Sequence, residues 1–350
     1  MRVAIIGAGN SGCAHAAKLV QNGHIVNLIK TSNAMHNENF DTIMQSKCIK
    51  CIDHTDNDNR FVAKLNLVTK DLEKGLEGVD VVMVLTQSLQ HKNLAPKVGP
   101  YLKDGQIVFI IPGNLGSTQL AKYTNKDVIF VEGESTPFDA RISALGVVNI
   151  LFRNARNAVA FLRDEHRIYL DKINELFKAH KYLRTNIFES ALHNPNLIVH
   201  TIGAIMSASR IETSNGEFSL YKEAFTPSIW NLIKDLDAEK MKVITACGGE
   251  QAISYIDSAK WRNEEDLSKD SLEVFKSYSE DAPKGPFEVN SRYIYEDVPM
   301  GLCLLENLGK IKNIETPIAS SLISIASSLL SIDYRKQAYK IEEIKGFIAK

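Results

Sequence analysis

A glycine-rich turn close to the first residue, Gly7-Ala8-Gly9-Asn10-Ser11-Gly12, constrains the fold more than any other feature of the sequence. It follows the apolar run VAIIG and precedes an alanine-rich stretch with helical spacing. Glycines in this pattern permit a tight turn and let a pyrophosphate approach the backbone, where the N–H groups of a helix N-terminus favour an anion. Because a strand precedes the turn and a helix follows it, a dinucleotide site is favoured over a simple turn. The residues expected to contact the dinucleotide are Gly7, Gly9, Asn10, Ser11 and Gly12.

Short apolar runs rich in Val and Ile alternate with helical segments through the first half of the chain, at residues 3–7, 24–29, 79–85, 106–111 and 127–133. Continuous apolar strands between helices are typical of a parallel sheet that is covered on both faces. From Asn186 onward helical spacing takes over. We therefore predict an α/β chain with a Rossmann-type, doubly wound dinucleotide-binding domain in residues 1–185. An all-α C-terminal domain that carries substrate and catalytic residues is expected in residues 186–350.

Two later segments need separate interpretations. The polar, turn-rich stretch from Asn263 to Pro286 is expected to be a surface excursion between helices. The apolar run from Ile318 is interrupted by serines and is shorter than the roughly 20 residues that a membrane span needs. It is therefore predicted to be a buried helix.

The overall composition excludes several classes of partner. Lys and Arg number 41 and Asp and Glu 42, so the net charge of -1 gives no field that would recruit nucleic acid or an anionic membrane. The start of the chain lacks the pattern of an export signal, and five cysteines suggest reduced thiols, so we expect a cytoplasmic protein. Cys48 and Cys51 have no second ligand pair nearby, and no metal site is predicted. Small molecules are the expected partners, and a homodimer remains open.

The end of the second apolar run bears on the choice of dinucleotide. A carboxylate usually stands there and binds the ribose 2′-hydroxyl of NAD, whereas this chain has Lys30, Thr31 and Ser32. A cation and two hydroxyls suit the 2′-phosphate of NADP(H), which we favour. NAD(H) is the alternative if Lys30 is only a solvated lysine at a strand end.

Polar turns follow three further strands, at the edge of a parallel sheet where ligands gather. The first contains Gln87, the second Gly113 and Asn114, and the third Thr136. Each could be ordinary turn chemistry, but three in succession predict the rim of a cleft. We expect Gly113 and Asn114 to contact the cofactor and Gln87 to contact the substrate.

The stretch ALHNPNLIVH, residues 191–200, contains a candidate histidine for proton transfer. Pro195 suits the first position of a helix and Asn194 suits its cap, so His193 would lie just outside the helix. A helix N-terminus disfavours an imidazolium, so His193 is expected to stay neutral unless a carboxylate lies nearby. The alternative is that His193 is only a polar residue before a cap.

The segment RYIYEDVP, residues 292–299, supplies candidate partners for this histidine. Asp297 would orient His193 and stabilise its protonated form, and Arg292 would bind a substrate carboxylate with its planar fork. The alternatives are an N-cap for Asp297 and a surface cation for Arg292, and sequence spacing does not decide between them. Pro299 is expected to start a helix that Gly309 ends.

Taken together, these motifs resemble the octopine/nopaline, or opine, dehydrogenase family. They are GxGNxG, PGNLGS, ESTPFDAR at 134–141, HNPN at 193–196 and RYIYEDVPMGL at 292–302, in order over nearly the whole chain. The resemblance implies a Rossmann domain followed by a helical domain, with the active site between them. It also implies that His193 is the acid/base, Asp297 its partner, Arg292 a carboxylate ligand and Thr136 a residue that holds the oxo acid. Asp139 departs from the family pattern and leaves the identity of the substrate open.

The reaction that the resemblance implies is an NAD(P)H-dependent reductive condensation of a 2-oxo acid with the amine of an amino acid, through an imine. The chain would then be an NAD(P)-dependent dehydrogenase acting on CH–NH donors. One alternative is a ketopantoate-type 2-oxo acid reductase, which needs no amine and uses a lysine as its acid. Another is a non-catalytic protein that senses a nicotinamide dinucleotide.

Overall fold

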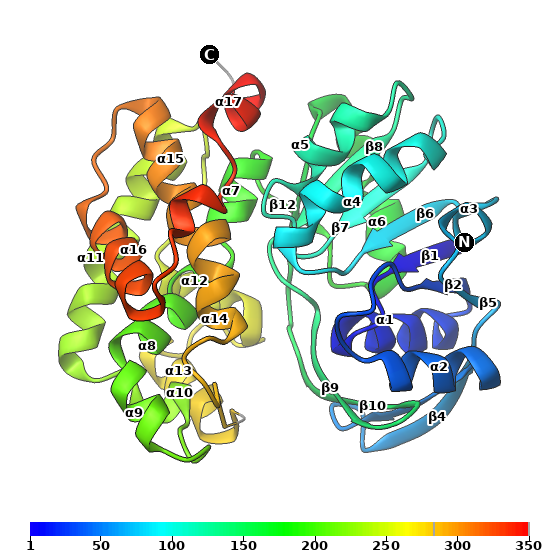
Figure 1. The fold of residues 1–350 in the computed structure, drawn as a ribbon, viewed down its shortest axis with the longest axis horizontal. Coiled ribbons are helices and arrows are strands. Elements are labelled where there is room, and N and C mark those ends of the chain that lie inside the picture. Colours follow the sequence, from blue (N-terminus) through cyan, green and yellow to red (C-terminus); the bar gives the residue numbers. More distant parts are fainter. Residues whose placement is uncertain (283, 349–350) are drawn as a thin grey trace. The chain divides into compact units, whose positions relative to one another are not determined.

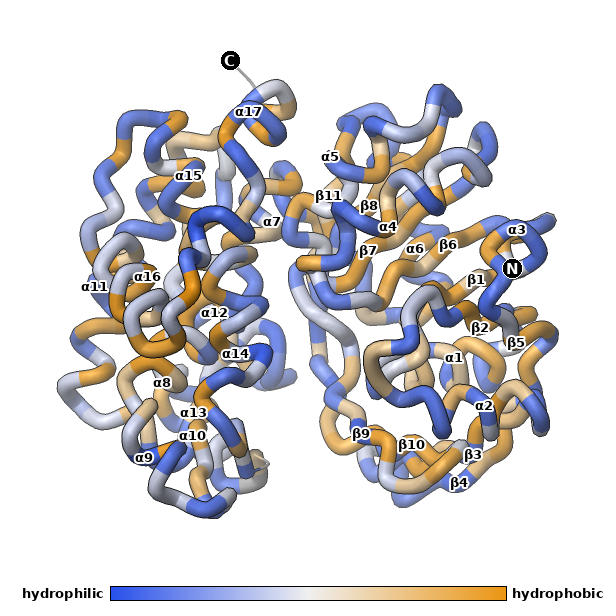
Figure 2. The backbone as a smooth tube through the Cα atoms, in the orientation of Figure 1, coloured by the Kyte–Doolittle hydropathy of each residue, from blue (hydrophilic) through white to orange (hydrophobic). Residues whose placement is uncertain are grey.

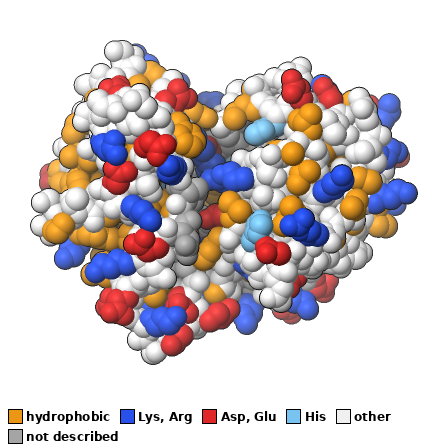
Figure 3. Space-filling view, turned by 90° about the horizontal axis from the view of Figure 1, so that it is seen from below, with side chains coloured by type: hydrophobic (Ala, Val, Ile, Leu, Met, Phe, Trp, Pro, Cys, Tyr) orange, Lys and Arg blue, Asp and Glu red, His pale blue; other side chains and the backbone are white. Residues whose placement is uncertain are grey.

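The computed structural model describes residues 1–282 and 284–348. The chain forms two compact units, Met1–Leu183 and Arg184–Lys350, which we call the first and the second unit (Figure 1). The first contains the sheets and the second is helical. On the face shown in Figure 3, Lys and Arg side chains are interspersed with Asp and Glu side chains, as the balanced composition leads one to expect.

The first unit is built on an eight-stranded sheet with the order β12-β11-β8-β7-β6-β1-β2-β5. Its parallel part contains β1 (Arg2–Ile6), β2 (Ile25–Ile29), β5 (Leu67–Thr69), β6 (Val81–Val84), β7 (Ile107–Ile110) and β8 (Ile129–Gly133). At one edge β11 (Ala158–Phe161) runs antiparallel to β8, and β12 (Tyr182–Leu183) pairs with β11 in parallel. Strands lie at all five predicted apolar runs, and the order of the six parallel strands is that of a Rossmann-type sheet.

Helices cover both faces of this sheet. Val3 and Ile5 of β1 belong to one buried cluster, together with residues of α1 (Asn10–Gln21) and α6 (Leu170–Phe177). Ala4 and Ile6, which alternate with them, belong to a second cluster with α3 (Leu72–Leu76), α4 (His91–Val98) and α5 (Gly116–Leu120). Figure 2 shows the corresponding hydrophobic stretches along β1, β6 and β7. Burial of both faces confirms the predicted doubly wound fold.

A second sheet in the first unit was not predicted. Its four strands have the order β4 (Asn59–Lys64), β3 (Cys48–Asp53), β10 (Val147–Arg153) and β9 (Phe138–Ala144), and α2 (Asn37–Ser46) precedes β3. The sheet packs against α1, where the fully buried carboxylate of Asp53 accepts hydrogen bonds from Lys18 Nζ at 2.9 Å and Arg153 Nη2 at 3.3 Å. The buried ion pair between Asp53 and Lys18 therefore links the second sheet to α1, the helix that follows the glycine turn.

The second unit is helical, as predicted. Its helices are α7 (Ile187–Leu192), α8 (Val199–Met206), α9 (Ala208–Thr213), α10 (Leu220–Glu223), α11 (Pro227–Ala246), α12 (Tyr255–Asn263), α13 (Ser271–Asp281), α14 (Arg292–Tyr295), α15 (Cys303–Lys312), α16 (Pro317–Leu330) and α17 (Ile341–Ile344). Within its described residues, the only β pairing is an isolated bridge between Ser219 and Gly285. No single helix of the described chain is long and apolar enough to cross a membrane, although the bent pair Pro317–Leu330 and Tyr334–Phe347 passes that test by length and composition.

Two local predictions in this unit need correction. The stretch from Asn263 to Pro286 is not only a polar excursion, because it contains α13, whose N-cap Asp270 accepts hydrogen bonds from the backbone of Leu272 and Glu273. Pro283 in that stretch lies outside the described residues.

The helix predicted after Pro299 does not end at Gly309. It starts as a π-helical turn, η6 (Val298–Leu302), and continues as α15 to Lys312, where Asn313 adopts a left-handed conformation with φ 57°. Gly309 is needed for a different reason: a Cβ there would lie 2.8 Å from the carbonyl oxygen of Ile314.

Candidate functional site

The glycine turn of the first unit has the geometry of an anion site. A Cβ on Gly7, whose φ is +118°, would lie 2.6 Å from the carbonyl oxygen of Leu85, and one on Gly12 would lie 1.8 Å from that of Gly7. These two glycines are therefore required by the turn itself. Gly9 is different, because the nearest atom to a Cβ there is 3.7 Å away, on His36. Gly9 is also the N-cap of α1 and supplies no capping side chain, so the first N–H groups of the helix are open to an anion.

The two polar residues of the turn have partners within the protein. The side-chain oxygen of Asn10 accepts a hydrogen bond from the backbone N–H of Ile142 at 2.8 Å, which ties the turn to β9. The carbonyl of Ser11 lies 2.8 Å from Nδ1 of His15. Asn10 therefore has a structural role, and the expected contacts of Asn10 and Ser11 with the cofactor remain predictions.

A group of basic side chains lies at the end of β2. Lys30 is buried, and its ammonium donates a hydrogen bond to the carbonyl of Met35. Burial lowers the pKa of Lys30, and the charge of Lys70 lowers it further, whereas the charge of Asp41 raises it. Burial and the charge of Lys30 likewise lower the pKa of His36. The structure thus adds Lys70 and His36 to the three predicted residues, of which Ser32 is exposed.

The loop after β7 is held by a carboxyl that sequence reasoning missed. Glu132 of β8 is fully buried and accepts hydrogen bonds from the N–H groups of Leu115 and Ser117, at 3.0 and 2.9 Å, and from the Ser117 hydroxyl at 2.5 Å. Burial raises the pKa of Glu132 to about 7. A Cβ on Gly113 would lie 2.3 Å from this carboxyl, which explains the glycine. Asn114 and Leu115 are left-handed, with φ 45° and 62°, a conformation that concentrates at functional sites.

Two of the three polar turns are in contact with each other, those that follow β6 and β7. Nδ2 of Asn114 donates a hydrogen bond of 2.9 Å to the hydroxyl of Ser88, the residue after Gln87. In the turn after β8 the hydroxyl of Thr136 donates a hydrogen bond of 3.0 Å to the backbone carbonyl of Phe138, two residues later in the chain. The roles of Gln87, Gly113 and Thr136 toward ligands remain predictions.

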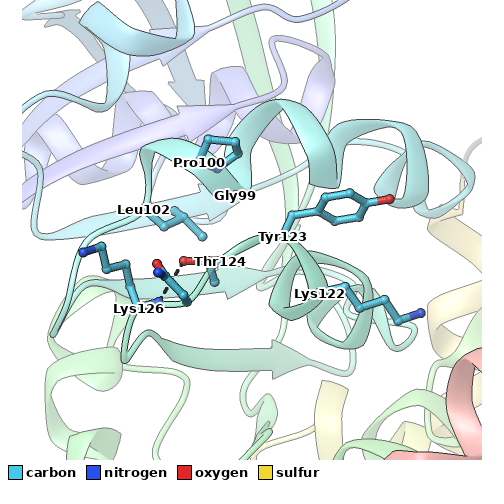
Figure 4. Close-up of a pocket in the computed structure, with 8 residues that line it drawn as sticks. Gly99, Pro100, Leu102, Lys122, Tyr123, Thr124 and Lys126 are labelled. Carbon is cyan, nitrogen blue, oxygen red and sulfur yellow. Dashed lines mark hydrogen bonds between the residues drawn. The ribbon is translucent and has the colours of Figure 1, made fainter.

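A cavity elsewhere in the first unit does not belong to this rim. Figure 4 shows its lining, which includes Gly99, Leu102, Tyr123 and Lys126. These residues precede β7 and β8, so the cavity lies at the amino ends of the strands, whereas the glycine turn and the polar turns follow the carboxyl ends.

In the second unit the carboxylate of Asp297 is paired with His200. Nδ1 of His200 donates to Oδ2 of Asp297 at 2.7 Å, and both side chains are buried. The ring of Tyr293 stacks on the imidazole, with centroids 3.7 Å apart and planes at 9°. The hydroxyl of Tyr221 lies 3.4 Å from Nε2, the other ring nitrogen. His200 therefore has one nitrogen fixed by a carboxylate and one face covered by an aromatic ring.

The predicted pairing of His193 with Asp297 is wrong. Nε2 of His193 donates to the carbonyl of Gln251 at 2.7 Å, and Nδ1 is buried without a hydrogen-bond partner. The reason is local: Asn194 caps a 3₁₀ turn at Pro195, as predicted, and the chain then enters α8, whose first turn carries His200 to α14 and Asp297. The signal in the sequence was the second histidine of the same stretch, seven residues later.

His193 anchors a connecting segment, Gly248–Ser254, between α11 and α12. Buried charges hold the same segment: Glu189 accepts from the N–H of Glu250 at 3.0 Å, and Lys240 donates to the carbonyl of Ile253 at 3.1 Å. Burial lowers the pKa of His193 well below its ordinary value, and the charges of Arg184 and Lys240 lower it further. This lowered pKa favours the neutral imidazole that was predicted, but burial and nearby cations, rather than a helix N-terminus, lower it.

Arg292 begins α14, five residues before Asp297. Its side chain is 52% exposed, and its Nε lies 3.9 Å from Oε2 of Glu296. Partial burial lowers the pKa of this guanidinium, but the carboxylates of Glu296 and Asp297 outweigh it, so the pKa is raised. Arg292 is therefore a reachable cation next to the His200–Asp297 pair, and its role as a carboxylate ligand stays a prediction.

The described part of the chain contains no group of three or more His, Cys, Asp or Glu side chains that could hold a metal ion. Cys51 is buried in β3 and Cys48 is partly exposed, and neither forms a disulfide.

Two family models match consecutive parts of the chain. Residues 183–330 match the alpha-helical domain of NAD/NADP octopine/nopaline dehydrogenase, and residues 3–156 match ketopantoate reductase PanE/ApbA. The chain is 24% identical to an opine dehydrogenase of Arthrobacter sp. (strain 1C), over 97% of this chain and 94% of that protein. It is 20% identical to vitopine synthase of Allorhizobium ampelinum, over 95% and 92% of the two chains.

Solved structures show the same fold. Octopine dehydrogenase in complex with NADH and agmatine superposes with a TM-score of 0.75 at 18% identity, over 95% of this chain and 90% of that one. NADP⁺-bound yersinopine dehydrogenase superposes with a TM-score of 0.74 at 12% identity, over 99% and 98%.

Proposed function

Because the chain belongs to the opine dehydrogenase family of NAD(P)-dependent dehydrogenases, as its motifs predicted, we propose that it condenses a 2-oxo acid with the amine of an amino acid and reduces the product. The observation that carries this proposal is the buried pair of His200 and Asp297, 2.7 Å apart. A condensation that loses water needs a group that takes and returns a proton, and an imidazole held by a carboxylate is such a group.

His200 is therefore the proposed acid/base, in place of His193. Its neutral Nε2 removes one proton from the substrate ammonium. The freed amine then adds to the keto carbon, and an N–H proton passes to the oxygen to form a carbinolamine. The imidazolium then returns the proton to the hydroxyl, so water leaves and an iminium remains. A bound nicotinamide dinucleotide supplies the hydride that reduces the iminium carbon to a secondary amine.

Asp297 has a positioning role in this scheme. It accepts the Nδ1–H of His200 in both protonation states, so the nitrogen that faces the substrate is always Nε2. Its negative charge also stabilises the imidazolium that forms during amine addition. The stacked ring of Tyr293 restricts rotation of the imidazole, which keeps Nε2 aimed in one direction.

Arg292 is proposed to bind a carboxylate of the substrates. Its guanidinium is exposed on the helix that leads to Asp297, and its planar fork matches a carboxylate with two parallel hydrogen bonds. A substrate held there would present its keto carbon or amine to Nε2 of His200 rather than to bulk water.

NADP(H) is the proposed cofactor, with NAD(H) as the weaker alternative. Lys30, Lys70 and His36 bring three basic side chains to the end of β2, beside the hydroxyls of Thr31 and Ser32. Positive charges of this kind stabilise a phosphate, which supports recognition of the 2′-phosphate.

A reductase that acts on a 2-oxo acid alone is the second candidate, because the first unit matches the ketopantoate reductase model. The test is to follow nicotinamide absorbance with NADPH and a set of 2-oxo acids, alone and with each of a panel of amino acids. Oxidation that requires both substrates supports the condensation. Oxidation by the oxo acid alone, at a rate that no amino acid raises, would support the reductase instead.

A further inference from the structure

The hydroxyl that approaches the reactive nitrogen of His200 belongs to a residue with no assigned role. Nδ1 of His200 is held by Asp297, so the atom that meets the substrate is Nε2, and the Tyr221 hydroxyl lies 3.4 Å from it. Tyr221 comes from α10, which packs on α13. Under the proposed function, groups attached to the reacting carbon or amine would therefore lie next to the Tyr221 ring.

Tyr221 is the inner member of a set of touching aromatic rings, which we call the aromatic cluster: Tyr221, Phe225, Trp230, Phe275 and Tyr278. Its ring meets that of Tyr278 edge to face, with centroids 5.1 Å apart. Phe275 meets Phe225 at 5.2 Å and Trp230 at 5.0 Å, also edge to face. Such offset contacts are the favoured geometry of aromatic pairs, and they make the cluster a stiff surface.

The cluster is not an ordinary piece of core. Phe275 is buried, but the other four rings are only partly covered. The two charged residues of α10 are paired with other charges: Lys222 lies 2.9 Å from Glu280, and Glu223 lies 2.9 Å from Arg210. A contiguous, partly exposed apolar surface beside the proposed acid/base is therefore a candidate contact surface for a ligand.

We infer that the aromatic cluster binds the side chain of the amine substrate and selects amino acids with uncharged, apolar side chains. This inference rests on the proposed function, because the His200–Asp297 pair defines where the amine must lie. It also distinguishes this chain from the octopine dehydrogenase that has been solved with L-arginine, whose ligand carries a guanidinium. An aromatic wall contacts leucine, methionine or phenylalanine well and offers no carboxylate to arginine.

The test compares kcat/KM for leucine, alanine, arginine and glutamate with the 2-oxo acid and NADPH held at saturation. One methylene in an apolar pocket changes kcat/KM by roughly tenfold or more, so leucine should exceed alanine by at least that factor. Arginine and glutamate should fall below alanine. Phe225→Ala should reduce the leucine-to-alanine ratio about tenfold.

Two matched variants separate recognition from folding. Tyr221→Phe keeps the ring and removes the hydroxyl, so the leucine-to-alanine ratio should persist. Phe287→Ala removes an aromatic side chain that is 68% exposed and outside the cluster, so neither rate should change. Thermal unfolding of each variant shows whether a lost rate reflects lost structure.

The outcomes separate this inference from the proposed function. Amine-dependent oxidation that favours arginine or glutamate would overturn the inference and leave the condensation intact. A leucine preference that Phe225→Ala does not weaken would also overturn it. Oxidation that no amino acid supports would overturn both.

Discussion

The same substitution at two histidines, seven residues apart, tests the assignment of the acid/base. His200→Gln removes the imidazole that Asp297 holds, and His193→Gln removes the one that donates to Gln251. Glutamine occupies a similar length and can donate a hydrogen bond, so it preserves part of the structural role at each site. We expect His200→Gln to lose turnover and His193→Gln to keep it.

The magnitudes follow from the contacts. A positioned proton-transfer group is worth typically 10²–10⁴-fold in rate, so kcat of His200→Gln should fall by that factor, or about 3–5 kcal/mol in barrier height. For His193→Gln the contact at stake is one buried hydrogen bond, worth about 1 kcal/mol of folding free energy. In a unit of this size that lowers the melting temperature by about 2–4 °C.

Asp297→Asn supplies an intermediate case. Replacing the carboxylate keeps a hydrogen-bond acceptor but removes the charge, and a hydrogen bond to a charged group is worth about 1.5–3 kcal/mol. The expected loss in kcat is roughly ten- to a hundredfold, less than for His200→Gln. A double variant, His200→Gln with Asp297→Asn, should be no slower than His200→Gln alone, because the carboxylate acts through the imidazole.

The assay is steady-state oxidation of NADPH with both substrates, together with binding of NADPH measured by fluorescence. All four variants should bind the dinucleotide like the wild type, since none of the substituted residues lies in the first unit. A His193→Gln enzyme that loses a hundredfold in kcat while His200→Gln stays near the wild-type rate would refute the reassignment.

Three further results are expected. Lys70→Ala should raise the KM for NADPH about tenfold and leave that for NADH unchanged, because only the 2′-phosphate meets this charge; equal effects on both would contradict the NADP(H) proposal. Arg292→Ala should raise the KM of one substrate far more than it lowers kcat, and an unchanged KM would remove Arg292 from the site. Burial lowers the pKa of His15 to about 4 and that of His180 to about 3, so their stabilising contribution is complete above pH 6.5 and is lost as the pH falls toward these values. Burial also lowers the pKa of His91 to about 4. Glu132, with its pKa raised to about 7, acts in the opposite direction, but one carboxyl offsets only part of the effect of three imidazoles. The melting temperature should therefore fall between pH 7 and pH 5, and a constant melting temperature would mean that these imidazoles are protonated in the folded protein.

The fold could be predicted from the sequence where burial is continuous. Strands β1, β6 and β7 are covered on both faces and therefore appear as uninterrupted apolar runs. The second sheet was missed because its strands alternate. In β3 buried positions are separated by exposed or half-buried ones, including Lys50, and the parallel partner β10 lies almost a hundred residues away in the chain. Such pairing depends on tertiary contacts that local patterns do not contain.

The candidate site was only partly predicted, because the pairing of its side chains also depends on tertiary contacts. Asp297, Arg292 and the stretch 191–200 were all found from motifs, but the choice of imidazole depends on how α8 packs against α14. His193 and His200 are both buried, so burial does not separate them either. What separates them is the partner: a backbone carbonyl for one and a carboxylate for the other. Glu132 was not predicted because it is a single carboxyl in an apolar strand, and no motif or residue spacing in the sequence indicates its role.

The π-helical turn at Val298–Leu302 determines the direction in which Asp297 points relative to the side chains of the helix that follows. Such a turn holds one residue more than an α-helical turn, and one residue in an α-helix corresponds to a rotation of 100°. Deleting a single residue here would let the helix regularise and would swing the carboxylate away from the imidazole by about a quarter of a circle. The length of this short segment is thus as important to the geometry of the proposed acid/base pair as the two side chains themselves.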